Sequence, residues 1–390
     1  MNWSYRNVVL VCSTLAFFAT VSARLVISPV VPAIVDSFSV TNSAVGLALT
    51  GMWGAYALTQ FPSGVLGDRI GEREIILMSV GGTAIVSTLL ALSPSFLIFA
   101  VLVLALGVTA GLHYITATSL LTRQFDQTGR AIGYHITGAP LAGLVAPALA
   151  GVVGSQFGWR PAVFIGTVFA VPTFLLFASR VRPMEPRFPE TPMRERVELG
   201  LLREILSRGP ILYTTALSVL GAFTWQATAS FLPAFLVAAH GHSPMLAGIL
   251  FSVYFFIHGA LQPFMGSLSD RFSRDAVAAT TMTVGIVGYG TLVVSTWFPA
   301  TVVAIIAVGI AMTWGAPLQS RFIDVLRADE QGAGFGLVRT TYMLLGASGS
   351  VAVGTAADVF GWNPAFGMLA GVMALGLTVI VANRLLGLGY

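Results

Sequence analysis

Arg24 has the most distinctive chemistry in the chain, because it lies inside an apolar stretch that runs from about Val8 to Val35. A guanidinium stays protonated at any accessible pH, so its surroundings must accommodate a permanent positive charge. If the stretch crosses a bilayer, an arginine there is costly and normally faces a cavity, where it can bind an anion. The alternative is that the side chain extends to the outer lipid headgroups. The apolar residues and prolines that follow Arg24 favour the cavity.

Other polar residues recur at helical spacing inside apolar stretches. Two sets share one helix face each: Trp53, Tyr56 and Gln60, and Tyr254, His258 and Gln262. A single aromatic residue fits packing or an interfacial belt equally well, but whole sets favour a cavity. We predict a substrate-binding cavity lined by Arg24, Tyr56, Gln60, His113, His135, Trp225, Gln226, Tyr254, His258, Gln262, Trp314 and Arg339. Trp53, Tyr114, Tyr134, Gln319 and Tyr342 are further polar residues of the same stretches.

Metal, cofactor and catalytic chemistry find little support in the sequence. His240 and His242 flank a glycine just before Ser243-Pro244, a pattern that favours a turn over a metal site. All twenty basic residues are arginine. The absence of lysine excludes a Gly-Lys-Ser/Thr phosphate loop and a retinal Schiff base, and with them pumps driven by a nucleotide or by light. We therefore expect no enzyme activity, no cofactor and no metal.

Membrane helices are the elements that must position these residues. Of 390 residues, 56% are hydrophobic and 9% are charged, whereas soluble proteins carry about 25% charged residues. The net charge of +4 reflects arginines in loops and indicates no nucleic acid partner. The apolar runs predict an all-α membrane protein with twelve helices, at 8–30, 44–64, 75–93, 96–121, 131–154, 161–180, 210–238, 245–266, 276–297, 300–320, 334–356 and 364–385.

One polar stretch divides these helices into six plus six. It predicts an N-terminal half (1–180), a central loop (181–209) and a C-terminal half (210–390). If the helices alternate in direction, Arg160 is alone on one side and the other loop arginines share the opposite side. The positive-inside rule then places both termini and the central loop in the cytoplasm, in a plasma or inner cell membrane. We expect a monomer in the lipid bilayer, and the single Cys12 excludes an intramolecular disulfide.

The two halves repeat each other at a nearly constant offset. The stretch "GVLGDRIGER" (64–73) recurs as "GSLSDRFSRD" (266–275), and "GWRPAVF" (158–164) recurs as "GWNPAFG" (361–367). Chance apolar similarity would not keep one offset along the chain, so we infer two homologous halves. The small residues before Arg24 resemble a signal cleavage site. However, Pro32-Ala33 has a partner in Pro233-Ala234, which assigns the first helix to the repeat.

At this point the sequence resembles the major facilitator superfamily over nearly its whole length. The stretch "GVLGDRIGER" is similar to that family's Gly-x-Leu-x-Asp-Arg-x-Gly-Arg-Arg signature between the second and third helices. The resemblance implies twelve helices in two pseudo-symmetric halves. It also implies a gating role for Gly64, Asp68, Arg69, Gly71, Arg73, Gly266, Asp270 and Arg271.

Two weaker resemblances point to different solutes. The spacing of Arg24 and Pro32 is similar to that of a substrate-binding arginine and a proline in organophosphate/phosphate antiporters, but Trp225 stands where their second arginine falls. "GLVAPALAG" (143–151) resembles an element of drug/proton antiporters. These antiporters carry an arginine four residues before a glycine in the fourth helix, whereas here Val103 precedes Gly107.

The sequence therefore predicts a secondary transporter that works by alternating access and moves a small, singly charged anion. Multidrug efflux by proton antiport and a non-transporting membrane sensor are the alternatives. No aspartate or glutamate falls within a predicted span, so a coupling proton would need His113, His135 or His258. Otherwise the chain exchanges a counter-anion or works as a uniporter, with Arg24 as the fixed charge.

Overall fold

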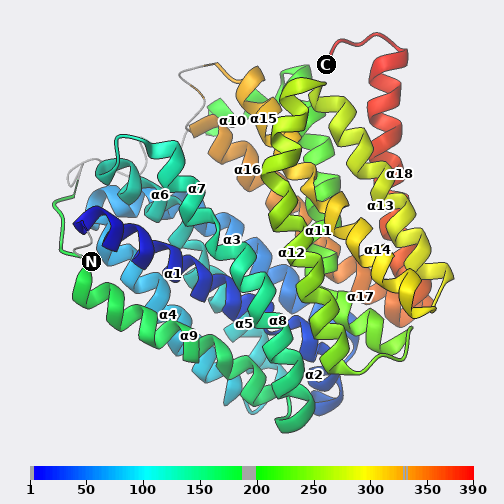
Figure 1. Ribbon diagram of the computed structural model, residues 1–390, viewed down its shortest axis with the longest axis horizontal. Helices are drawn as coiled ribbons and strands as arrows, with labels where there is room; N and C mark the ends of the chain where they lie inside the picture. Colours follow the sequence, from blue (N-terminus) through cyan, green and yellow to red (C-terminus); the bar gives the residue numbers. More distant parts are fainter. Residues whose placement is uncertain (1–3, 187–198, 328–329, 331–332) are drawn as a thin grey trace. The chain divides into compact units, whose positions relative to one another are not determined.

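The computed structural model describes residues 4–186, 199–327, 330 and 333–390, and every regular element among them is a helix (Figure 1). The predicted all-α membrane fold is confirmed. Part of the central polar stretch, with Arg187, Arg194 and Arg196, lies outside the described residues.

The helices follow the predicted order along the chain. Before the central loop they are α1 (Tyr5–Leu25), η1 (Ser28–Val30), α2 (Val31–Phe38), α3 (Asn42–Ile70), α4 (Glu72–Ala91), α5 (Phe96–Gly111), α6 (His113–Gln124), α7 (Thr128–Ile136), α8 (Gly138–Phe157) and α9 (Trp159–Arg180). After it they are α10 (Leu199–Leu206), α11 (Gly209–Ala238), α12 (Pro244–Arg271), α13 (Arg274–Val294), α14 (Phe298–Ala311), η3 (Met312–Trp314), α15 (Gly315–Val325), α16 (Ala333–Gly346), α17 (Ser348–Phe360) and α18 (Trp362–Leu385).

Eleven helical stretches of the described residues are long and apolar enough to cross a membrane. Helix α3 falls outside that set, yet its 29 residues correspond to about 43 Å at 1.5 Å per residue, which is also long enough. Several predicted spans consist of two helices that meet inside the span, at Leu112, at Thr137 and at Ala347. The first span bends at η1, which contains Pro29, because proline cannot donate the backbone hydrogen bond of a regular helix.

The described helices form two compact units. The first comprises Met1–Val40, Gly51–Val197 and Ser243–Ser252, and the second comprises Thr41–Thr50, Glu198–His242 and Val253–Tyr390. Each unit thus includes one short segment that belongs in sequence to the other half. These segments are the first turns of α3 and of α12.

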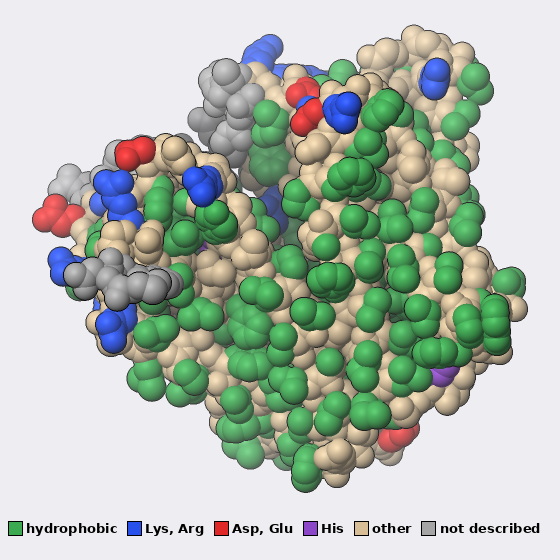
Figure 2. All heavy atoms as spheres, viewed as in Figure 1, with side chains coloured by type: hydrophobic (Ala, Val, Ile, Leu, Met, Phe, Trp, Pro, Cys, Tyr) green, Lys and Arg blue, Asp and Glu red, His purple; other side chains and the backbone are tan. Residues whose placement is uncertain are grey.

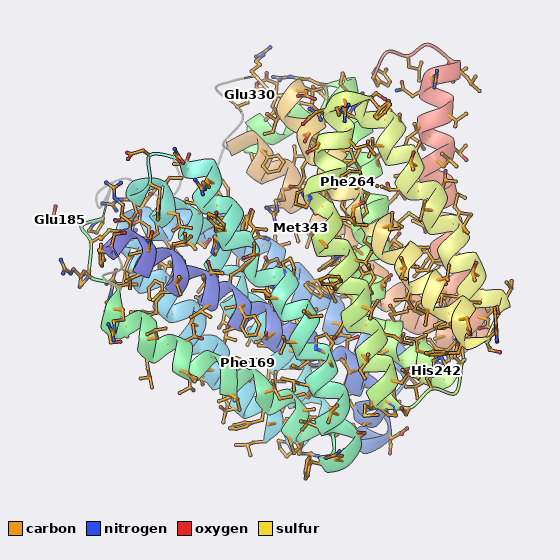
Figure 3. The ribbon with its side chains drawn as sticks, viewed as in Figure 1. Phe169, Glu185, His242, Phe264, Glu330 and Met343 are labelled. Carbon is orange, nitrogen blue, oxygen red and sulfur yellow. The ribbon has the colours of Figure 1, made fainter. Side chains whose placement is uncertain are left out.

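The core of the first unit is built from close helix packing. Helix α1 lies beside α8 and α9, and α4 lies beside α9 (Figure 1). Phe169, labelled in Figure 3, packs edge to face on Phe18 with ring centroids 5.0 Å apart. Small residues allow the backbones to approach: a Cβ at Gly151 would lie 2.8 Å from the carbonyl oxygen of Pro244, within the same unit. Such contacts replace the hydrophobic effect, which does not drive helices together in lipid.

In the second unit, α11 packs against α16, α17 and α18, and α13 packs against α14 and α18. Asp358 at the end of α17 caps the first turn of α3. Its carboxylate accepts from the backbone N–H of Asn42 at 3.1 Å and of Ser43 at 2.6 Å, and also from both side chains. A carboxylate at a helix N-terminus satisfies unpaired N–H groups and the helix dipole.

Apolar side chains cover the flanks of the helices, and charged side chains gather near helix ends (Figure 2). Glu330, labelled in Figure 3, is one such charge: both of its oxygens accept from Arg208 at 2.6 Å. The Arg208 guanidinium lowers the pKa of Glu330 to about 2. This ion pair therefore stays intact at neutral pH and joins the start of α11 to the segment before α16.

Candidate functional site

Arg24 is held at the end of α1 and is 5% exposed. Its Nε donates to the carbonyl of Thr20 at 3.3 Å, and its Cζ lies 4.0 Å from the ring centroid of Tyr56 and 5.2 Å from that of Trp53. Tyr56 also forms a side-chain hydrogen bond with the guanidinium. A cation over an aromatic face gains about 2 kcal/mol or more when desolvated. Arg24 makes no ion pair with a carboxylate of the described residues, so its charge is offset by the two aromatic faces, the Tyr56 side chain and the Thr20 carbonyl.

His113 and His135 lie in the same unit and are both fully buried. Their ring centroids are 5.3 Å apart, and Phe17 of α1 packs on both, at 5.7 Å and 5.1 Å. The backbone of Ser13 interacts with both imidazoles, but among the described residues no ring nitrogen makes a hydrogen bond of standard geometry. The sequence analysis named the two histidines but not Phe17, which stands seven residues before Arg24 and therefore about two turns away on α1.

Gln60 completes the set of predicted residues from the first unit. It is 4% exposed and lies one turn after Tyr56 on α3. Tyr134, in contrast, is 51% exposed and contacts Arg130 on its own helix, so it lies apart from the buried polar residues.

The second unit brings together two groups of predicted residues. On α12, Tyr254 stacks on His258 with ring centroids 6.3 Å apart, and His258 hydrogen-bonds to Gln262. Trp314 packs on Tyr342 at 6.3 Å and lies directly against Gly221, where a Cβ would come within 2.4 Å of the indole.

The remaining predicted residues of this unit come from α11, α15 and α16. Trp225 packs edge to face on Phe255 at 6.3 Å. Gln226 donates to the carbonyl of Met343 at 2.9 Å, and Figure 3 labels Met343. Arg339 and Gln319 are half-buried, on α16 and α15.

The gating residues implied by the signature lie in or beside the last two turns of α3 and α12 and at the start of α4. Arg73 donates from Nε to the carbonyl of Val181 at 2.7 Å and from Nη2 to that of Ala178 at 2.9 Å, so it caps the end of α9. Gly71 begins the turn into α4 with a φ of 115°, which favours glycine. Asp68 is half-buried and Arg69 is exposed. Gly64 lies against α6, where a Cβ would come within 2.9 Å of Ile115.

The second copy of the signature uses different ion pairs. Asp270 pairs with Arg274 on the next helix, and Arg274 also bonds Asp324 at 2.9 Å. Asp275, which replaces the arginine of the first copy, pairs with Arg321 at 2.9 Å. Arg271 is exposed and Gly266 has room for a Cβ, with its nearest neighbour at 3.9 Å.

Glu72 is a buried acid that the sequence analysis did not select. Its side chain is fully buried, and it accepts from Arg123 at 2.8 Å and from Ser119 at 3.2 Å. The signal in the sequence was its position directly after the turn glycine Gly71, where a carboxylate suits a helix N-terminus. Arg123 in turn donates to the carbonyl of Glu185, which Figure 3 labels.

The loop between α11 and α12, which carries two histidines, makes structural contacts in the described residues. His240 bonds the hydroxyl of Thr301 at 3.1 Å and the carbonyl of Leu292 at 2.8 Å. Burial and the neighbouring His240 lower the pKa of His242, which Figure 3 labels. The part of the chain that the structure describes contains no group of three or more His, Cys, Asp or Glu residues that could hold a metal.

Long apolar helices that bury an arginine and two histidines define a multi-pass membrane protein with polar groups in its interior. The sequence model described as Major Facilitator Superfamily matches residues 12–243 and 215–386. The chain therefore belongs to the Major Facilitator Superfamily, whose members are membrane transporters that bind small molecules and are not enzymes.

Relatives within this family differ in their solutes. The multidrug resistance protein MdtG of Citrobacter koseri is 27% identical over 306 residues, which are 73% of this chain and 71% of that protein. The hexuronate transporter of Bacillus subtilis is 23% identical over 375 residues, or 90% of this chain and 88% of that protein. A solved bacterial homologue of the human lysosomal transporter Spinster has a TM-score of 0.82 at 16% identity and covers 98% of both chains, which shows the shared fold.

Proposed function

We propose that this chain is a secondary transporter of small, singly charged organic or inorganic anions, with Arg24 as the anchor for the charge. One observation carries the proposal: Arg24 is 5% exposed, lies over Tyr56 and Trp53, and makes no ion pair with a carboxylate of the described residues. A buried charge that lacks a counter-ion is strongly unfavourable. An incoming anion supplies that counter-ion.

The shape of guanidinium and the similarity to the hexuronate transporter support an oxyanion. Guanidinium presents a planar set of N–H donors that matches a carboxylate or phosphate in a bidentate manner. A hexuronate is a sugar carboxylate, and that relative aligns over 90% of this chain. The aromatic walls formed by Trp53 and Tyr56 can pack on the carbon skeleton of such a solute.

Binding to the purified protein tests the proposal. The thermal unfolding temperature is measured with acetate, glucuronate, dimethyl phosphate, inorganic phosphate or tetraphenylphosphonium, since a ligand of the native state raises it. We expect at least one anion to stabilise the parent protein. Arg24→Gln and Arg24→Lys should both weaken its binding by about tenfold or more, because an ammonium lacks the planar fork.

Two results would overturn the anion proposal. The first is that Arg24→Gln binds the best anion as tightly as the parent protein does. The second is that only tetraphenylphosphonium, the hydrophobic cation, stabilises the protein. Stabilisation by this cation would instead support the second candidate function, multidrug efflux by proton antiport, which the similarity to MdtG favours.

We further propose that the protein acts as a monomer in a plasma or inner membrane, with both termini in the cytoplasm. The asymmetric distribution of loop arginines supports this orientation. A reporter that is active only in the cytoplasm should give signal when fused after Arg187 and none when fused after Asp36. The reverse pattern would show that the chain is inserted the other way.

A further inference from the structure

His113 and His135 are the least explained polar residues of the first unit. Both are fully buried, and within the described part of the chain none of their ring nitrogens makes a hydrogen bond of standard geometry. A buried polar group that lacks a hydrogen bond costs about 1 to 3 kcal/mol. Stability alone therefore does not account for a pair of imidazoles at this place.

Aromatic packing holds the two rings in a defined position. Phe17 lies 5.7 Å from His113 and 5.1 Å from His135, and the planes of Phe17 and His113 are nearly parallel, at 15°. Tyr114 flanks His135 at 6.4 Å. The phenyl ring of Phe17 fixes the imidazoles but offers no acceptor. The backbone of Ser13 interacts with both imidazoles, so the pair is an ordered site at which a proton can be held.

The charges around this pair come from α1, α3, α4, α6 and α7, because the described residues of α5 and α8 contain no titratable or charged group. Arg24 acts electrostatically on His113. The acid Glu72 is already paired with Arg123, and its partner Ser119 lies six residues beyond His113, or about 9 Å along α6. The other titratable or charged groups on these helices are Tyr5, Arg6, Cys12, Tyr56, Asp68, Arg69, Arg73, Glu74, Tyr114, Arg130 and Tyr134.

We propose that the His113–His135 pair binds one proton together with each anion at Arg24, so that the protein is a proton/anion symporter. This inference rests on the proposed anion site and names the ion that is coupled to it. Two imidazoles this close share one proton, because a second charge beside the first is repelled in a medium of low dielectric constant.

Charge balance provides the coupling. While Arg24 lacks a counter-ion, its positive charge repels a proton on His113. An anion at Arg24 cancels this repulsion, and by linkage the bound proton strengthens the binding of the anion by the same factor. A proton and a singly charged anion together add no net charge to the protein interior, which limits the electrostatic cost of carrying the loaded site across the membrane.

The pH dependence of anion binding tests this inference. The probe is whichever of acetate, glucuronate and dimethyl phosphate binds most tightly, because the charge of each stays constant between about pH 5.5 and 8, the range in which imidazole titrates. Because the complex holds one proton more than the free protein, the Kd of the parent should rise about tenfold per pH unit on the alkaline side. In the double variant His113→Asn/His135→Asn, the Kd should be independent of pH.

A control and a second measurement make the result decisive. His242→Asn in the loop between α11 and α12 removes a histidine outside the proposed site and should keep the parent's pH dependence. Calorimetry of the parent in two buffers with different ionisation enthalpies should show about one proton taken up per anion, which decides the question even if the double variant fails to fold. The inference is wrong if the parent binds the anion with no proton uptake, or if the double variant keeps the pH dependence. The anion site itself fails by the separate criterion of Arg24→Gln.

Discussion

Gly107→Ala is expected to destabilise the protein by about 2 kcal/mol or more, a large effect for one added methyl group. A Cβ at Gly107 would lie 2.1 Å from the carbonyl oxygen of Met52 and 2.9 Å from its carbonyl carbon. These atoms belong to the backbone of α3, so no side-chain rotation can relieve the clash. Helix α5 must move away from α3, next to Trp53 and its contact with Arg24. The expected result is a lower thermal unfolding temperature of the purified variant.

Gly371→Ala is the matched control. Gly371 also lies within a long helix, α18, but no atom lies within 4 Å of the place where its Cβ would stand. This change should leave the unfolding temperature unchanged or raise it slightly, because alanine has the higher helix propensity. Equal unfolding temperatures for the two variants would contradict the close approach of α5 and α3.

Substitution of Glu72 by alanine is the second change that should strongly lower the stability of the protein. Its fully buried carboxylate binds Arg123 and Ser119, and Glu72→Ala leaves the guanidinium and the hydroxyl without that acceptor. Removing one member of a buried ion pair costs about 3 to 5 kcal/mol. The 24% exposure of Arg123 places the expected value at the lower end, since solvent screens part of the remaining charge. Thermal unfolding and the yield of folded protein in detergent measure the loss.

An exposed ion pair of the same unit serves as the comparison. Arg6 and Asp126 lie 3.3 Å apart, with side chains that are 57% and 94% exposed. Asp126→Ala should therefore change the unfolding temperature very little. A double variant that lacks both Glu72 and Arg123 should be more stable than Glu72→Ala alone, because no unpaired charge remains. If Glu72→Ala is as stable as Asp126→Ala, the buried pair is not a stabilising contact.

Hydropathy was sufficient to predict the helices because a bilayer requires every backbone hydrogen bond to be made within the span. It could not predict where a span is broken. The interruption at Leu112 lies inside one predicted span, directly before His113, and hydropathy does not report backbone conformation. The end of α3 at Ile70, six residues past the predicted limit of 64, was missed because its polar last turns extend beyond the apolar run.

The candidate site was predicted in part. Arg24, His113 and His135 stand out as polar residues in apolar sequence, and α1, α6 and α7 bring them into one unit. Phe17 was not predicted, because a phenylalanine in a membrane helix carries no signal of its own. Glu72 was not predicted because it lies outside the predicted spans, so its burial depends on Arg123, which is distant in sequence. That Arg24 lines the same cavity as residues of the second unit, such as His258, stays a prediction.

The segment 243–252, which belongs to the first compact unit, has a consequence for the order of events during biosynthesis. Helix α8 meets it at Gly151 and through the backbone N–H of Ala148, which donates to the hydroxyl of Ser252 at 3.1 Å. Ribosomes add about 5 to 20 residues per second, so α8 must wait on the order of ten seconds for this partner after it has been made. During this time its glycine-rich face is open to lipid or to the insertion machinery. The N-terminal half therefore cannot finish folding before part of the C-terminal half has entered the membrane.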